Sequence, residues 1–105
     1  MSHFSLRVGD RGKAEQELMT SIRKATSIEE TAPKRKHVRN MIVFTWDYKT
    51  SIPIWDNMKA QPLRADEVQC YKALIALHKV IREGHTVSVQ EALTQTAFLE
   101  ELGRG

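Results

Sequence analysis

Apolar side chains recur at helical spacing along most of the chain. Between Lys13 and Thr26 they stand three or four residues apart, at Ala14, Leu18, Ile22 and Ala25. This spacing places them on one face of an amphipathic helix. A second helix is expected to begin near Pro33, because the fixed backbone angle of proline suits a first turn. Its expected buried face comprises Val38, Met41, Ile42 and Trp46.

Three further helices are predicted downstream. Ser51, two residues before Pro53, can cap a short helix whose buried residues are Ile54, Trp55 and Met58. A fourth helix is expected to end at Gly84 in a left-handed turn. More than half of its circumference is apolar, through Val68, Tyr71, Leu74, Ile75, Leu77, His78 and Ile81. The run from Ser88 to Glu91 is typical of a capping box, opening a fifth helix that reaches about Leu102.

No segment shows the sustained alternation of a β-strand, so the sequence predicts an all-α fold. About five helices joined by short turns indicate a helical array, either a bundle or the start of a solenoid. Residues 1–12 contain Gly9 and Gly12, and their apolar residues Phe4, Leu6 and Val8 show no clear helical period, so we expect a flexible leader there.

The composition is that of an ordinary globular domain. Of the 105 residues, 41 % are hydrophobic and 28 % are charged, and the formal net charge of +3 is mild for a nucleic-acid-binding domain. The single cysteine, Cys70, cannot form an internal disulfide and is expected to be a small core residue in a reducing compartment. No apolar run approaches the roughly 20 residues of a membrane span, which predicts a cytoplasmic protein unless something recruits it to a surface.

Candidate chemistry lies at the junction of the first two predicted helices. Lys24 stands at the end of one helix, and Lys34, Lys36 and His37 stand at the start of the next. The N-terminus of a helix offers unpaired N–H groups and the positive end of the helix dipole, which favour phosphate. The junction therefore predicts a site that binds a compact phosphorylated headgroup.

Other interpretations of the same residues remain open. A basic cluster on a helix is often only a solvated face, and a small basic helical module can bind RNA or DNA through the same lysines. A protein–protein scaffold that binds neither lipid nor nucleic acid is a third possibility. An enzyme is not indicated, since Glu29 and Glu30 suit loop capping better than acid–base chemistry. No metal site is expected, and His78 is predicted to be a hydrogen-bonded core residue.

The basic cluster also carries a resemblance to a known family. The phosphoinositide-binding signature of the ANTH domain is a lysine, nine residues of any type, a second lysine, one residue of any type, a lysine or arginine, and a histidine or tyrosine. This chain matches it with Lys24, Lys34, Lys36 and His37. The sequence from about Lys13 to Gly103 resembles the huntingtin-interacting-protein-1-related branch of these endocytic clathrin adaptors. The resemblance implies that residues 13–105 are the N-terminal helices of an ANTH/ENTH-type α-superhelix.

The resemblance implies a ligand and a set of binding residues. The ligand is phosphatidylinositol 4,5-bisphosphate, bound by Lys24, Lys34, Lys36 and His37, with Arg23 and Arg35 as second-rank contacts. No cofactor is implied. The implied location is the cytoplasmic side of the plasma membrane, at endocytic sites and actin patches.

Partners are implied as well. They are the ENTH domain of epsin, which shares the lipid, together with clathrin and actin, which regions absent from this chain would contact. A whole ANTH domain is more than twice as long as this chain, so truncation is expected to uncover an apolar face and to cause self-association. That face would comprise Leu93, Phe98, Leu99 and Leu102.

Overall fold

The computed structural model describes residues 11–28 and 35–104. Over that range the chain forms six α-helices and one 3-10 turn, and none of the residues described is in a strand, which confirms the all-α prediction. The elements are α2 (Arg11–Ala25), α3 (Arg35–Tyr48), α4 (Ile52–Ala60), η1 (Leu63–Ala65), α5 (Glu67–Glu83), α6 (Val87–Leu93) and α7 (Thr96–Arg104). Residues 1–10 of the expected leader lie outside the described residues, whereas Arg11 and Gly12 belong to α2.

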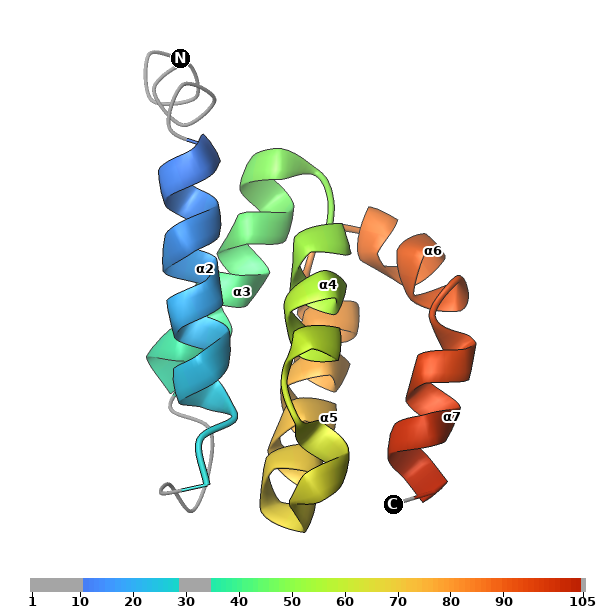
Figure 1. The fold of residues 1–105 in the computed structure, drawn as a ribbon. Helices are drawn as coiled ribbons and strands as arrows, with labels where there is room; N and C mark the ends of the chain where they lie inside the picture. The colour runs from blue at the N-terminus through green and yellow to red at the C-terminus, as the bar shows by residue number, and fades with distance from the viewer. Residues whose placement is uncertain (1–10, 29–34, 105) are drawn as a thin grey trace.

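The first four helices lie side by side and alternate in direction (Figure 1). Helix α2 runs antiparallel to α3, α4 runs antiparallel to α5, and α3 and α5 run parallel to each other. Helices α6 and α7 follow on the other side of α4 and α5 from α2. The end of α2 and the start of α3 therefore lie at the same end of the molecule.

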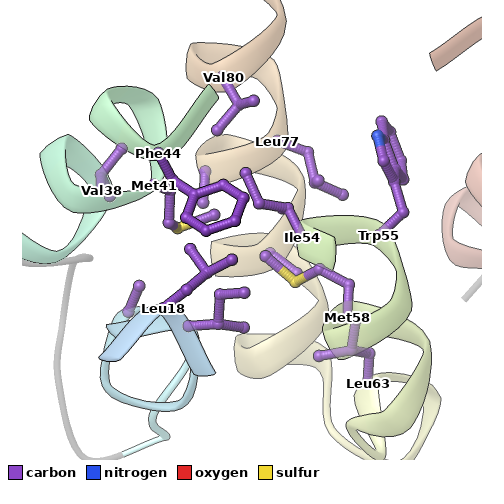
Figure 2. Packing of buried hydrophobic residues seen from close by; sticks show 14 of the residues in the cluster. Leu18, Val38, Met41, Phe44, Ile54, Trp55, Met58, Leu63, Leu77 and Val80 are labelled. Atoms are coloured by element: carbon purple, nitrogen blue, oxygen red, sulfur yellow. The ribbon is translucent and has the colours of Figure 1, made fainter. Parts of the chain in front are cut away.

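One apolar core joins α2, α3, α4 and α5 (Figure 2). Ile22 of α2, Met41 of α3 and Ile54 of α4 are completely buried, and α5 contributes Ala73, Ala76, Leu77 and Val80. The ring of Trp55 is also completely buried, as expected, and its neighbour is Phe98 of α7 in an edge-on arrangement with ring centroids 6.3 Å apart. The expected faces of the first and third helices are thus confirmed. They form the platform on which the helix ends are fixed.

Trp46 is not the core residue that the sequence predicted. Its side chain is 47 % exposed, and the buried residues of α3 next to it are Phe44 and Thr45. The indole Nε1 donates a hydrogen bond to the carbonyl of Glu83 at 3.0 Å, and the ring stands edge-on to His85. The tryptophan therefore covers the C-terminus of α5, where helix carbonyls lack partners within the helix.

The predicted buried face of α5 was wrong in several positions. Val68, Tyr71 and His78 are exposed, whereas small residues and Lys72 point inward. Because Ala73 and Ala76 are small, α5 can approach the neighbouring helices closely on this side. The neighbours therefore cover this face of α5. Cys70 is half-buried against the core, consistent with the small structural role expected for it.

Gly84 ends α5, but not in a left-handed turn. Its φ of −79° and ψ of −177° are those of extended backbone. A Cβ atom at this position would lie 2.5 Å from the carbonyl oxygen of Val80 and 2.7 Å from Oγ1 of Thr45. Close packing of the chain against α3 therefore explains the glycine.

The predicted fifth helix is divided in two, and its capping box does not form. Helix α6 begins after Thr86, so Ser88 lies inside it, and Glu91 turns away toward the start of α4. The break follows at Thr94, whose hydroxyl donates to the carbonyl of Glu91 at 2.6 Å. Such side-chain bonds compete with the helical ladder and tighten the turn.

Candidate functional site

The last turn of α2 carries two cations, Arg23 and Lys24, and both are exposed. Ala25 and Thr26 beside them are completely buried, and the hydroxyl of Thr26 donates to the carbonyl of Ile22 at 2.9 Å. The backbone at this helix end is therefore fixed while the basic side chains extend into solvent. Cations are favourable here on their own account, because the C-terminus of a helix carries the negative end of its dipole.

The first turn of α3 presents a different arrangement. Arg35 and Lys36 are exposed, whereas His37 is only 8 % exposed and Val38 beside it is buried. The imidazole thus lies at the inner edge of the turn, and the two long cationic side chains lie outside it. In general, the first N–H groups of a helix lack partners within that helix, and this favours an anion at such an end.

A hydrogen bond between two described residues helps to set the register of α2 against α3. Asn40 Nδ2 donates to Ser21 Oγ at 3.1 Å, and Ser21 is buried. Lys24 follows Ser21 by three residues, and Lys36 precedes Asn40 by four, so each lies one turn beyond this contact. Because the two helices are antiparallel, both turns point to the same end of the pair (Figure 1). The structure therefore brings Lys24 to the same end as Lys36 and His37.

The remaining predicted residues are placed as follows. Lys34 lies outside the described residues. Arg23 shares the last turn of α2 with Lys24. Arg35 lines a groove between α3 and α5, together with Ile75 and Lys79, and so faces α5 as well as solvent.

Lys72 belongs to this region and was missed from the sequence. It is 1 % exposed, and its ammonium donates a hydrogen bond to the carbonyl of Ser27, which follows the end of α2. A buried positive charge therefore lies beneath the start of the connection between α2 and α3. A signal existed in the sequence, since Lys72 precedes Ala76 and Val80 by four and eight residues and thus shares the buried face of α5.

Other kinds of site find no support in the part of the chain that the structure describes. No group of three or more His, Cys, Asp or Glu residues there could hold a metal ion. The histidine expected in the core, His78, is on the surface instead, because the inward face of α5 belongs to the alanines and Leu77. None of the described helices combines the length and apolarity needed to cross a bilayer.

Comparison with known proteins places this geometry in context. The model of the ANTH domain family matches residues 17–105. The chain is 50 % identical over 104 residues to "Endocytosis protein end4" of Schizosaccharomyces pombe, covering 99 % of this chain and 9 % of that protein. It is 47 % identical over 92 residues to "Protein SLA2" of Saccharomyces cerevisiae, covering 88 % of this chain and 10 % of that protein. The chain thus spans about a tenth of the length of these two relatives.

Two solved structures share the fold. One, titled "The ENTH domain from epsin-2 in complex with phosphatidylinositol 4,5-bisphosphate (PIP2)", has a TM-score of 0.86 and 56 % identity over 91 % of this chain and 37 % of its own. The other, "Structure of the endocytic adaptor complex AENTH", has a TM-score of 0.82 and 48 % identity over 86 % of this chain and 36 % of its own. The expected helical architecture is confirmed by both.

Proposed function

The chain belongs to the ANTH domain family, and on that premise we propose that it binds phosphatidylinositol 4,5-bisphosphate and recruits an endocytic adaptor to the plasma membrane. The proposed ligands of the headgroup are Lys24, Lys34, Lys36 and His37, with Arg23 and Arg35 as outer contacts. The role is one of binding, without catalysis and without a cofactor. The observation that carries the proposal is the common register of Lys24 and Lys36 at one end of the α2–α3 pair.

The chemistry of this helix end suits an inositol bisphosphate. Lysine ammonium groups act as mobile point charges, and a histidine N–H is a directional donor, so the set can meet several phosphate oxygens. His37 is held by the fold, whereas Lys24 and Lys36 are exposed and can adjust to the ligand. The solved ENTH neighbour is a complex with this same lipid, which supports the choice of ligand.

Binding strength sets the need for partners. Each cation near an anionic leaflet contributes about 1 kcal/mol, so four of them supply roughly 4 kcal/mol, close to millimolar affinity. Stable recruitment then requires a second contact, and we propose co-assembly with the ENTH domain of epsin. The second structural neighbour is an endocytic adaptor complex, which favours this partner class. Links to clathrin and actin patches would come from other regions of a longer adaptor.

Self-association is a second source of avidity. The apolar surface available for it differs from the one that the sequence predicted. Leu102, which the sequence placed on an uncovered face, is buried, and Phe98 and Leu99 are half-buried against the core. Leu93 is 69 % exposed, and Val89, one turn earlier on α6, is 46 % exposed. We therefore propose that any self-association uses Val89 and Leu93.

Liposome sedimentation tests the lipid site. We expect the wild type to prefer vesicles containing phosphatidylinositol 4,5-bisphosphate over phosphatidylserine vesicles of equal charge. Lys34→Glu combined with Lys36→Glu is expected to abolish that preference. The matched control is Lys49→Glu combined with Arg82→Glu, which changes the charge equally at exposed positions near the opposite end of α3 and α5. Retained preference in the first variant, or equal loss in the control, would overturn the proposed site.

A nucleic-acid binder gives a different result in the same series. Its affinity for DNA or RNA falls steeply with salt and does not respond to soluble inositol phosphates. A wild type that ignores the lipid but binds DNA would replace the proposal with that function. One that ignores both would indicate a protein–protein scaffold.

A further inference from the structure

A groove runs between α3 and α5, starting at Arg35 beside the proposed lipid site. Its volume is about 730 Å³, within the usual range for binding clefts. The floor is apolar, and the rim is charged. The lining residues are Arg35, Val38, Arg39, Ile42, Val43, Ile75, Lys79 and Glu83.

Positive charge dominates the rim. Arg35, Arg39 and Lys79 supply three cations, against the single carboxylate of Glu83. Among the residues that the structure describes, none of the three cations lies within ion-pair distance of an acidic side chain. Their charges are therefore available to an acidic partner, which the groove attracts more strongly than a neutral or basic one.

The charges are unevenly placed along the groove. Trp46 Nε1 donates to the Glu83 carbonyl, and the His85 N–H donates to Thr45 Oγ1, so the C-terminal ends of α3 and α5 are adjacent. Glu83 marks this end of the groove. Arg35 lies in the first turn of α3 and marks the other end, with Arg39 one turn along. The groove is thus basic at one end, and it passes Val43 before reaching Glu83.

The apolar floor favours a peptide over a bare anion. Val43 is 36 % exposed, and Trp46, one turn further along α3, is 47 % exposed. An isolated phosphate group gains nothing from such surface, whereas an amphipathic helix covers it with side chains at positions i, i+3, i+4 and i+7. Two parallel helices also provide a track along which a third helix can lie.

We propose that the α3–α5 groove is a docking site for an acidic amphipathic helix of a partner protein. Carboxylates of that helix face Arg35, Arg39 and Lys79, and its apolar stripe lies on Val38, Ile42, Val43 and Ile75. A second copy of this chain fits less well, because the chain itself carries a net charge of +3. The groove adjoins the proposed lipid site and shares Arg35 with its outer edge, so a docked helix would lie next to the membrane contact.

The test uses a designed helical probe. Three labelled peptides of about 18 residues share one leucine stripe: one carries glutamate on the flanks, one carries lysine there, and one is a scrambled form of the first. Fluorescence anisotropy measures affinity, and amide NMR shifts locate the contact. We expect the glutamate peptide to bind and to shift the amides of residues 38–43 and 75–83.

A charge exchange makes the test specific. In the variant Arg39→Glu combined with Lys79→Glu, the affinity for the glutamate peptide is expected to fall by about tenfold or more, and the affinity for the lysine peptide is expected to rise. The control Lys49→Glu with Arg82→Glu is expected to change affinity by less than about twofold, since these charges lie outside the groove. The preference for vesicles containing phosphatidylinositol 4,5-bisphosphate over phosphatidylserine vesicles should persist in the groove variant, because Arg39 and Lys79 are not among the proposed headgroup ligands.

Several outcomes would overturn the docking proposal. They are no binding of the glutamate peptide at millimolar concentration, equal binding of the scrambled peptide, and shifts confined to other surfaces. Loss of vesicle binding in the groove variant would assign these cations to the membrane instead. If sedimentation velocity shows a dimer for the wild type and a monomer for the groove variant, the groove would be assigned to a second copy of the chain.

Discussion

Glu91 of α6 is predicted to hold the start of α4. Its carboxylate accepts hydrogen bonds from the Ser51 backbone N–H at 2.5 Å, the Ser51 hydroxyl at 2.7 Å and the Thr50 hydroxyl at 2.8 Å. Ser51 is the N-cap residue of α4, is completely buried and makes no capping bond of its own. Glu91 therefore supplies from another helix the contact that a capping-box glutamate makes within one.

The loss of unfolding free energy in Glu91→Ala depends on the hydrogen-bond donors that lose their acceptor. The Thr50 hydroxyl is only partly buried and can turn to water, but the Ser51 N–H and hydroxyl are enclosed. Each buried donor without a partner costs about 1–3 kcal/mol, and bonds to a charged acceptor are at the upper end. Because the three bonds share one carboxylate, the total is less than their sum, and we expect a loss of about 3 kcal/mol. For a chain of this length that lowers the melting temperature by roughly 10–20 °C.

Urea unfolding, followed by circular dichroism and tryptophan fluorescence, measures the loss. Gln90→Ala is the matched control, because it removes an exposed side chain from the same turn of α6 and should cost less than about 0.5 kcal/mol. A double-mutant cycle with Ser51→Ala should give a coupling energy of at least about 1 kcal/mol. If Glu91→Ala costs no more than the control, or if the two changes are additive, the capping role is wrong.

Three other substitutions test the remaining buried contacts. Gly84→Ala places a Cβ against the Val80 carbonyl and the Thr45 hydroxyl and is expected to cost about 2 kcal/mol in urea unfolding; full stability would contradict the close approach. Ser88→Ala removes a buried hydroxyl that has no hydrogen-bond partner in the described structure, so stability should stay level or rise by up to about 1 kcal/mol, and a clear loss would reveal a hidden partner. Lys72→Met removes both a buried ammonium and its bond to the Ser27 carbonyl, so the two effects on stability should nearly cancel, to within about 1 kcal/mol. Vesicle binding should weaken, and unchanged sedimentation with the bisphosphate lipid would remove Lys72 from the site.

The helices themselves were predictable because their apolar periods are local. Leu18 and Ile22 share a face by spacing alone, and both are buried as expected. The short helix after Ser51 was equally clear, with Ile54 and Met58 four residues apart and completely buried. Periodicity fails where a face is apolar nearly all round, as in α5, because the sequence does not say which side the neighbours cover. There, alanines at 73 and 76 mark the close contact better than the larger residues do.

The basic cluster could be located from the sequence because its members lie at predictable helix ends. Lys24, Lys36 and His37 all lie in the expected turns. The register between those turns was not predictable, because it depends on the Asn40–Ser21 contact between residues of separate helices. The inward direction of His37 likewise depends on how α3 packs.

The contacts that the sequence did not reveal share one physical feature: each joins a helix end to a polar side chain from a distant part of the chain. Glu91 serves the start of α4, Trp46 the end of α5, and Lys72 the backbone just after α2. Helix ends carry unpaired backbone groups, so they need such partners wherever they are enclosed. The same need makes an exposed helix end receptive to an outside anion, as at the start of α3. Ends bonded to distant side chains thus stabilise the array, and the start of α3, where Arg35 and Lys36 are exposed, is where we expect the phosphorylated ligand.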